Sequence, residues 1–266
     1  MKRIAWLTDL HLNFLAGEAV DKFLAQVAEC RADAVLISGD IAESHSLIRY
    51  LEWIADRLSV PIFFVLGNHD FYHSSIRKVR QDVTTLCERD KRLVWLGSAD
   101  SIELTPNVGL VGHDGWADAR LGNYERSLVM MNDYRLIEEF AGVSKKDRWP
   151  LLMQEAFVAA AHIRHVLPQA LGRYKRVLLA THVPPFREAC WHEGKISDDE
   201  WLPHFSSHAM GSALLEIMRD HPDHKLTVLC GHTHGRGEAH PTSNITVLTG
   251  AAEYGTPAIE RVFDLE

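Results

Sequence analysis

Near its N-terminus the chain reads Ile4-Ala5-Trp6-Leu7-Thr8-Asp9-Leu10-His11, a short apolar run that ends in an aspartate and a histidine. Apolar runs of this length, rich in β-branched and aromatic residues, predict buried strands. Seven such runs are found, at residues 4–8, 34–38, 62–66, 109–112, 177–181, 226–230 and 245–248. Segments with the length and periodicity of helices lie between them, at residues 18–31, 44–58, 74–89, 123–140, 150–170 and 206–220. This alternation predicts an α/β fold built of packed layers.

The length of 266 residues suits one domain that spans 1–266. Two long stretches, at about 114–149 and 184–208, interrupt the alternation and are predicted to be elaborations on the core. Ser44 and Ser74 stand where helix N-cap residues are expected, and Pro150 suits the first turn of a helix.

Composition excludes several classes of protein. Lys and Arg number 28 and Asp and Glu number 36, so the formal net charge is −8, opposite in sign to a protein that binds long nucleic acids. No run approaches the ~20 apolar residues that span a bilayer, and the apolar stretch near the N-terminus is too short for a signal peptide. The four cysteines have no paired short spacing, which argues against a zinc knuckle or a disulfide scaffold. We expect a soluble cytoplasmic protein that binds neither a membrane nor long nucleic acid; a homo-oligomer stays open.

Polar side chains with metal-binding chemistry follow five of the predicted strands. Because open α/β sheets bind ligands beyond the carboxyl ends of their strands, we expect these side chains to meet at one edge. Residues two apart on an extended chain face the same way, so Asp9 with His11, and His232 with His234, can each reach one centre. Seven candidate metal ligands result: Asp9, His11, Asp40, Asn68, His182, His232 and His234.

Seven ligands are more than one ion needs. Carboxylate, imidazole and amide oxygen together suit divalent Mn, Fe, Co or Zn. We therefore predict two divalent ions about 3.5–4 Å apart. Any one of these residues alone would be interpreted as a helix cap or as a buried, hydrogen-bonded side chain, but their occurrence at five strand ends favours a metal centre.

The ordered motifs resemble those of the calcineurin-like metallophosphoesterase superfamily. They are, in chain order, Asp9-Leu10-His11, Gly39-Asp40, Gly67-Asn68-His69-Asp70, His182 and Gly231-His232-Thr233-His234. The resemblance implies a four-layer α/β/β/α sandwich. It also implies that one ion is held by Asp9, His11, Asp40 and His234, and the other by Asp40, Asn68, His182 and His232, with Asp40 as the bridge.

The same resemblance implies the chemistry. A water between the ions would lose its proton near neutral pH and attack phosphorus. Asp40 would serve catalysis by holding both ions, while Asn68 and His69 would lie at the substrate. His69 would protonate the leaving oxygen, a task that suits histidine at neutral pH. Either Asp70 or Glu43 would orient the His69 ring, and the sequence does not choose between them.

The sequence says less about which phosphoester is the substrate than about the reaction. The motifs lack the Asp-Arg-Gly extension and the following arginine of protein Ser/Thr phosphatases, and their layout is similar to that of bacterial cyclic-nucleotide and glycerophosphodiester phosphodiesterases. We therefore expect a hydrolase of small phosphodiesters, a cyclic nucleotide or a related compound, whose base the aromatic loops could stack. His113 and Trp191 are candidate substrate contacts. A phosphomonoesterase acting on a small phosphorylated metabolite and a non-catalytic metal-binding or interaction scaffold are the alternatives.

Overall fold

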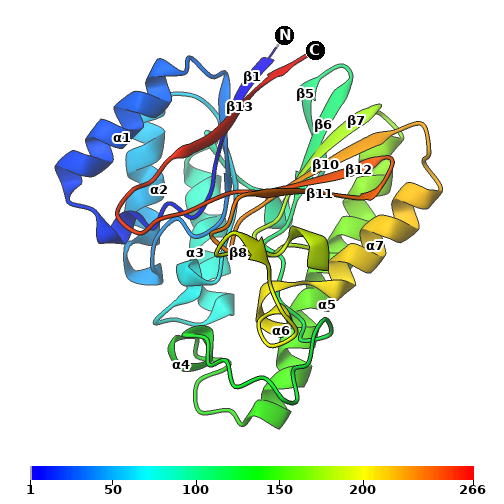
Figure 1. Ribbon diagram of the computed structural model, residues 1–266. Coiled ribbons are helices and arrows are strands. Elements are labelled where there is room, and N and C mark those ends of the chain that lie inside the picture. The colour runs from blue at the N-terminus through cyan, green and yellow to red at the C-terminus, as the bar shows by residue number, and fades with distance from the viewer. Residues whose placement is uncertain (1) are drawn as a thin grey trace.

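The computed structural model describes residues 2–266 and contains two β-sheets packed face to face (Figure 1). The first sheet has five strands in the order β13 (Ile259–Leu265), β1 (Lys2–Leu7), β2 (Ala34–Ser38), β3 (Ile62–Val65) and β4 (Leu93–Trp95). The second has six strands in the order β11 (Gly237–Thr242), β12 (Ile245–Thr249), β10 (Lys225–Cys230), β7 (Arg176–Ala180), β6 (Val108–Gly112) and β5 (Ile102–Thr105). A separate hairpin pairs β8 (Trp191–His192) with β9 (Lys195–Ile196).

Helices cover the outer faces of both sheets. The first sheet carries α1 (Gly17–Glu29), α2 (Ser44–Leu58) and α3 (Ile76–Arg89), and the second carries α5 (Lys145–Leu171) and α7 (His208–Arg219). Apolar side chains fill the space between the sheets and the space between each sheet and its helices. The predicted four-layer α/β/β/α sandwich is therefore confirmed. Of the helices in residues 2–266, none is long and apolar enough to cross a membrane.

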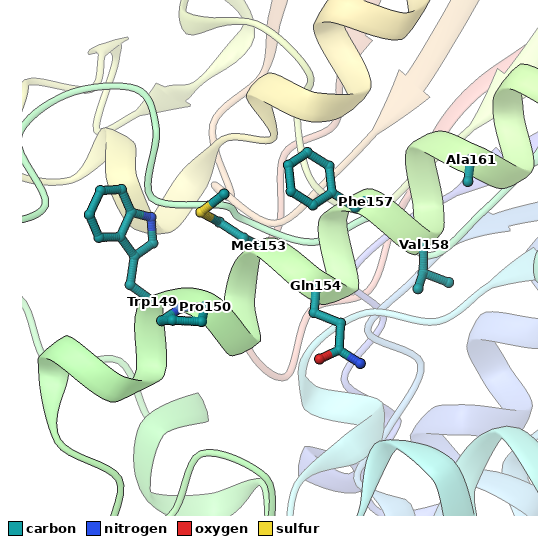
Figure 2. A pocket seen from close by; sticks show the side chains of 7 residues that line it. All are labelled: Trp149, Pro150, Met153, Gln154, Phe157, Val158 and Ala161. Atoms are coloured by element: carbon teal, nitrogen blue, oxygen red, sulfur yellow. The ribbon is translucent and has the colours of Figure 1, made fainter.

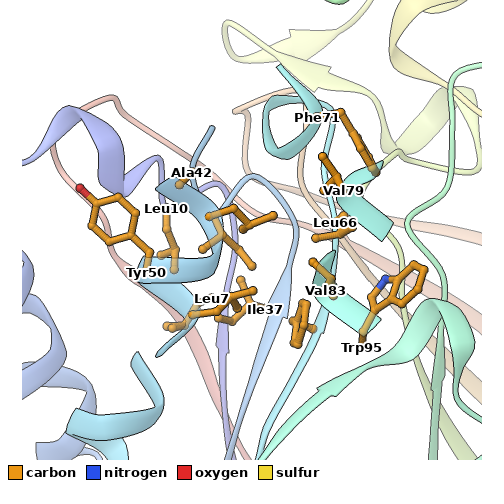
Figure 3. Close-up of a cluster of buried hydrophobic side chains, with 14 of the residues drawn as sticks. Leu7, Leu10, Ile37, Ala42, Tyr50, Leu66, Phe71, Val79, Val83 and Trp95 are labelled. Atoms are coloured by element: carbon orange, nitrogen blue, oxygen red, sulfur yellow. The ribbon is translucent and has the colours of Figure 1, made fainter. Parts of the chain in front are cut away.

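The core under the first sheet shows how the apolar pattern becomes packing. Leu7 of β1 and Ile37 of β2 point toward Tyr50 of α2 and Val83 of α3, and all four are buried (Figure 3). Burying a side chain of this size stabilises the fold by about 1.5–3 kcal/mol. Continuously apolar strands, buried on both faces, and an apolar period of about 3.6 in the helices thus hold the layers together.

Most strands of each sheet run parallel. β1, β2, β3 and β4 pair in parallel in the first sheet, as do β6, β7, β10 and β12 in the second. Their carboxyl ends therefore lie at one edge. Both elaborations, with the short helices α4 (Asp133–Leu136) and α6 (Leu202–Phe205), gather at the lower side of Figure 1. This edge is where ligand-binding loops are expected.

One predicted helix is wrong. Residues 123–140 form mostly turns, with α4 as their only regular helix. Side chains here bond to the local backbone: Asn123 Oδ1 accepts from the amide of Arg126 at 3.1 Å, and Ser127 Oγ accepts from the amide of Val129 at 3.2 Å. Such bonds compete with the helical ladder, and the apolar periodicity does not reveal them.

Three helix starts also differ from the prediction. The N-cap of α2 is Glu43 and not Ser44, and the N-cap of α3 is Ser75, whose hydroxyl accepts from the amide of Lys78. Since α5 begins at Lys145, Pro150 lies inside this helix and not in its first turn. The helix therefore starts within the stretch that was predicted as the first elaboration.

Candidate metal centre

Four side chains from three strand ends meet at this edge. Asp9 and His11 follow β1, Asp40 follows β2, and His234 follows β10; one donor atom from each lies within 4.8 Å of the others. His11 Nε2 lies 3.2 Å from His234 Nε2 and 3.7 Å from Asp40 Oδ2. His234 Nε2 lies 3.4 Å from Asp9 Oδ1. Because atoms bound at about 2.0–2.2 Å to one ion lie roughly 3–3.5 Å from each other, this first donor set fits a divalent ion.

A second donor set lies beside the first and shares Asp40 with it. Asn68 follows β3, His182 follows β7, and His232 follows β10. Asn68 Oδ1 lies 3.0 Å from His182 Nε2 and 2.9 Å from His232 Nδ1, and His182 Nε2 lies 3.4 Å from Asp40 Oδ1. Asp40 therefore offers Oδ2 to the first set and Oδ1 to the second, as a carboxylate shared by two ions would.

Hydrogen bonds behind the second donor set fix which atoms face inward. His232 Nε2 donates to the carbonyl of His204 at 2.9 Å, so neutral His232 carries a lone pair on Nδ1. His182 Nδ1 donates to the carbonyl of Ser38 at 2.9 Å, which leaves a lone pair on its Nε2. With both rings neutral, both lone pairs would face the Asn68 oxygen, an arrangement that is repulsive unless a cation lies among them, either a metal ion or the proton that His182 binds in its absence. The chemistry of the donors thus fits a metal ion.

Burial and neighbouring groups set the charge of the centre. Burial lowers the pKa of His11 and of His232 to about 4, so both are neutral near pH 7, the form that binds a metal. Burial alone would raise the pKa of Asp40, but His182 and His69 nearby hold it well below its usual value. Burial likewise opposes charge on His182, yet Asp40 outweighs this and raises the pKa of His182 to about 10. A bound ion would displace that proton.

The backbone around the donors is strained. Five of the seven candidate ligands have a positive φ, in the left-handed region that favours glycine. They are Asp9 (47°), His11 (45°), Asp40 (52°), His232 (72°) and His234 (56°). This conformation costs about 1–2 kcal/mol for a residue with a Cβ, and such strain concentrates at functional sites.

Two glycines let the strand-end loops approach the donors. A Cβ at Gly231 would overlap the carboxylate of Asp9 and the hydroxyl of Thr8, and a Cβ at Gly67 would overlap the carboxylate of Asp40. Any side chain at either position would therefore move a donor oxygen.

Asp70 joins two of these loops. Its Oδ1 accepts from the amides of Ile41 and Ala42, each at 2.9 Å, and its Oδ2 accepts from the amide of Gly67 at 2.8 Å. Because both oxygens are used in this way, the prediction that Asp70 orients the His69 ring is wrong. Glu43 does not orient it either, since its carboxylate lies beside two other histidines, 3.8 Å from His45 and 3.7 Å from His73.

A family model described as calcineurin-like phosphoesterase matches residues 2–236 of the chain. The chain belongs to this family. Its members are phosphoesterases that use two divalent metal ions, so this chain is a hydrolase of phosphoric esters, and its donor sets accord with that cofactor.

Solved structures of other phosphoesterases share the fold. A phosphopantetheinyl hydrolase from Mycobacterium tuberculosis is 13% identical, with a TM-score of 0.66, and the match covers 94% of this chain and 89% of that one. A dimetal phosphatase from Danio rerio is 17% identical, with a TM-score of 0.58, over 96% of this chain and 89% of that one. At these identities the likeness concerns the fold alone. A search of curated proteins found no match.

In this phosphoesterase His69 lies next to the first donor set without belonging to it. Its ring centroid is 4.5 Å from that of His11 and 4.3 Å from that of Tyr72. His69 Nε2 lies 4.0 Å from Asp40 Oδ2 and 3.5 Å from the hydroxyl of Tyr254, while its amide donates to Asp40 Oδ1 at 2.9 Å. The imidazole is therefore held beside the carboxylate that the two donor sets share, with Nε2 toward Asp40 Oδ2.

The Asn68 amide is held by two residues that the sequence did not reveal. Its Nδ2 donates to Asp133 Oδ1 at 2.8 Å and to the hydroxyl of Tyr72 at 3.1 Å. The Tyr72 hydroxyl itself donates to Asp133 at 2.7 Å. Asp133 lies in α4, within the first elaboration and far from any strand end, so no motif pointed to it.

The donor sets open into a pocket of about 230 Å³ with aromatic sides. Besides the donors Asp40, Asn68, His232 and His234, it is lined by His69, Met131, His192, Trp201, Phe205, Thr233 and Tyr254. Trp201 and Phe205 belong to the second elaboration, whose aromatic residues indicated a substrate contact in the sequence. Tyr254 follows β12, a strand without Asp or His at its end, so ligand chemistry gave no signal for it.

His113 and Trp191, the two predicted substrate contacts, lie outside this lining. His113 is buried, and its Nδ1 accepts from the amide of Gly115 at 3.2 Å. The indole of Trp191 packs against Gly237 of β11 instead, and the next residue, His192, lines the pocket. Neither predicted residue lines this pocket, because tertiary packing turns both side chains elsewhere.

Proposed function

We propose that this phosphoesterase hydrolyses small phosphodiesters, such as a cyclic nucleotide or a related compound. The observation that supports the proposal is the pair of donor sets that share Asp40 in one pocket. One ion would be held by Asp9, His11, Asp40 and His234, and the other by Asp40, Asn68, His182 and His232. When bound, two divalent ions supply Lewis acidity toward the phosphoryl oxygens and lower the pKa of a water for attack.

The residues of the chain would position the reactants and move the proton. Asp40 fixes the two donor sets relative to one another through its two oxygens. Asn68 faces the phosphate from the second set, and His69 Nε2, on the ligand side of the bridging carboxylate, donates a proton to the leaving oxygen. Since strand ends of both sheets supply donors to each set, we further propose that residues 1–266 work as a single domain.

Charge favours a diester. Two divalent ions carry +4 and the carboxylates of Asp9 and Asp40 carry −2, so a surplus of +2 attracts phosphate in spite of the net charge of −8. Within the described chain, the residues that line the pocket include neither Lys nor Arg. The water that loses its proton for attack leaves one negative charge at the site and reduces this surplus to +1. A diester brings one negative charge, which the remaining surplus neutralises, whereas a monoester brings up to two and finds no further cationic side chain.

The test combines a metal count with matched substrates. The protein is loaded with Mn²⁺, its metal content is measured by mass spectrometry, and kcat/KM is compared for bis(4-nitrophenyl) phosphate and 4-nitrophenyl phosphate. We expect two ions per chain and a higher kcat/KM for the diester.

Each other outcome has a defined meaning. A higher kcat/KM for the monoester would contradict the diester assignment and identify a phosphomonoesterase. Two bound ions without turnover of either ester would contradict the proposed hydrolysis, and the scaffold alternative would then hold. A single ion per chain would contradict the shared role of Asp40.

A further inference from the structure

Aromatic rings stand beside both donor sets, and they form two separate groups. The Tyr254 wall consists of Tyr254, which lines the pocket, and of Phe14, which packs against it outside the lining. The Trp201 wall consists of His192, Trp201 and Phe205, which all line the pocket. We propose that these walls hold the two ester groups of a phosphodiester, and that both groups are flat and uncharged. This inference rests on the proposed function and adds the class of substrate.

The Tyr254 wall stands against the first donor set. The Tyr254 ring centroid lies 4.5 Å from that of His11 and 5.2 Å from that of His234. Phe14 packs edge-on against Tyr254, with centroids 5.0 Å apart. Phe14 and Tyr254 are 53% and 49% exposed, so this wall presents ring surface to a ligand without any rearrangement of the core.

The Trp201 wall stands against the second donor set. The Phe205 ring lies 5.4 Å from that of His232, which belongs to the second set alone. Trp201, His192 and Phe205 pack on one another with centroid separations of 5.1–5.6 Å. His192 Nδ1 donates to the carbonyl of Thr233 at 2.9 Å, which fixes the ring and leaves Nε2 as an acceptor for a polar edge of the ligand.

The position of the two walls explains why one ester group would leave half of the pocket unused. The donor sets share Asp40, and each wall contacts histidines of one set only. A phosphate seated at the shared carboxylate therefore has a wall on either side. A monoester has one organic group and would cover one wall, as would a cyclic nucleotide, in which one sugar carries both ester bonds. An open-chain diester has two organic groups and would cover both walls, so the walls narrow the proposed substrate to open-chain diesters.

The lining also limits the charge of these groups. In the part of the chain that the structure describes, the cationic residues Lys and Arg are absent from the lining, and two buried carboxylates lie beneath the pocket at Asp9 and Asp40. A second acidic group on the substrate, held at a wall and away from the ions, would find no cationic side chain among the described residues of the lining. Aromatic rings instead attract flat, uncharged faces by stacking. Substrates with further phosphates or carboxylates are thus disfavoured.

The test uses non-hydrolysable phosphinates, so that binding is measured apart from turnover. Dimethylphosphinate, benzyl(methyl)phosphinate and dibenzylphosphinate each carry one negative charge and none, one or two phenyl groups. Their dissociation constants are measured by calorimetry on the Mn²⁺-loaded protein. We expect each phenyl group to tighten binding about 10-fold, the order of magnitude that one stacking contact supplies.

Variants then assign each phenyl group to a wall. Trp201→Ala and Tyr254→Ala should each remove the gain from one phenyl group, about 10-fold for dibenzylphosphinate, and the double variant should remove both gains. Trp149→Ala is the matched control, because Trp149 lies on α5 in a separate apolar groove (Figure 2) and should leave all three constants unchanged.

Three outcomes would overturn the inference. The first is equal affinity of the three phosphinates. The second is loss of the gain from the same phenyl group in both wall variants. The third is a higher affinity for an acidic analogue such as 4-carboxybenzyl(methyl)phosphinate than for benzyl(methyl)phosphinate. Each leaves the proposed function standing if the wild-type protein still binds two ions and cleaves bis(4-nitrophenyl) phosphate. If the wild-type protein does not cleave bis(4-nitrophenyl) phosphate, the proposed function is contradicted instead. Failure of the inference and failure of the proposed function are therefore distinguishable.

Discussion

The carboxylate of Asp133 accepts a hydrogen bond from the side-chain amide of Asn68, with 2.8 Å between Oδ1 and Nδ2. Because the amide nitrogen is held in this way, the amide oxygen is the atom that faces His182 and His232. The Tyr72 hydroxyl bonds to both partners and closes the arrangement. A residue of the first elaboration therefore determines which atom of Asn68 is offered to an ion.

Removal of this support should weaken the second donor set. In Asp133→Ala the amide can turn its nitrogen inward, and we expect affinity for the second Mn²⁺ ion to fall about 10–100-fold while the first ion stays bound. Asp133→Asn keeps an acceptor oxygen and should restore most of that affinity. The measurement is a Mn²⁺ titration followed by electron paramagnetic resonance.

A control in the same segment separates this effect from general loosening of the elaboration. Glu125 is exposed, and Glu125→Ala should bind both ions as the wild type does. An Asp133→Ala protein with unchanged affinity for the second ion would show that Asn68 needs no such support.

Asp40 should be needed for binding of both ions, whereas a residue of one donor set should be needed for one ion only. Asp40→Ala removes the two oxygens that the donor sets share, so we expect metal content to fall from two ions per chain toward none. Asn68→Ala removes a donor from the second set only and should retain the first ion. Mass spectrometry of the purified variants gives the counts; an Asp40→Ala protein that still holds both ions contradicts the bridge.

His69 should affect turnover and not metal binding. It contributes no atom to either donor set, so His69→Ala should keep two ions per chain. Loss of a general acid typically costs 10²–10⁴-fold in rate, and kcat should fall by about that factor. His45→Ala is a matched control, since this exposed histidine lies in the first turn of α2. If His69→Ala loses its metal, the role of His69 is structural.

The candidate ligands could be predicted from the sequence because strand ends obey a simple geometric rule. Once the runs ending at Asp9, Asp40 and His182 are parallel strands of packed sheets, their carboxyl ends meet at one edge. The central strands themselves could be predicted because burial on both faces makes them continuously apolar.

Edge strands could not be found in this way. The pattern missed four strands of the two sheets, β4, β5, β11 and β13, and all four lie at sheet edges; it also missed β8 and β9 of the separate hairpin. Residues of β13 are mostly part-exposed, so this strand carries no continuous apolar run. β4 is apolar throughout, but its three residues are too few to stand out as a strand. Asp133 and Tyr254 were missed because they reach the site through tertiary packing of loops, which no local pattern records.

Gly231 should tolerate no side chain. A Cβ there overlaps Asp9 and Thr8, so Gly231→Ala should lower the free energy of unfolding by about 1–3 kcal/mol and weaken the first ion. Gly172→Ala is the control, because a Cβ at Gly172 meets its neighbours at an ordinary 3.4–3.5 Å and the residue has a negative φ. Urea unfolding and Mn²⁺ titration give the two quantities. Equal stability of both variants would mean that the loop can shift.

His113 should make the fold sensitive to acid. Burial lowers the pKa of His113 to about 4, with Asp114 opposing this and Arg80 and His162 adding to it. Between pH 6.5 and 4 the unfolded chain therefore binds a proton at this residue that the folded chain does not, so stability is full above pH 6.5 and falls as the pH drops.

His113→Asn can keep an acceptor for the Gly115 amide without titrating, so it isolates this contribution. Other buried histidines are the same in both proteins and cancel in the difference. We expect the free energy of unfolding of the variant, relative to the wild type, to rise by about 1 kcal/mol when urea unfolding is repeated at pH 5.5 instead of pH 7.5. A difference that is the same at both pH values would mean that the folded protein accepts the proton on His113 as readily as the unfolded chain does.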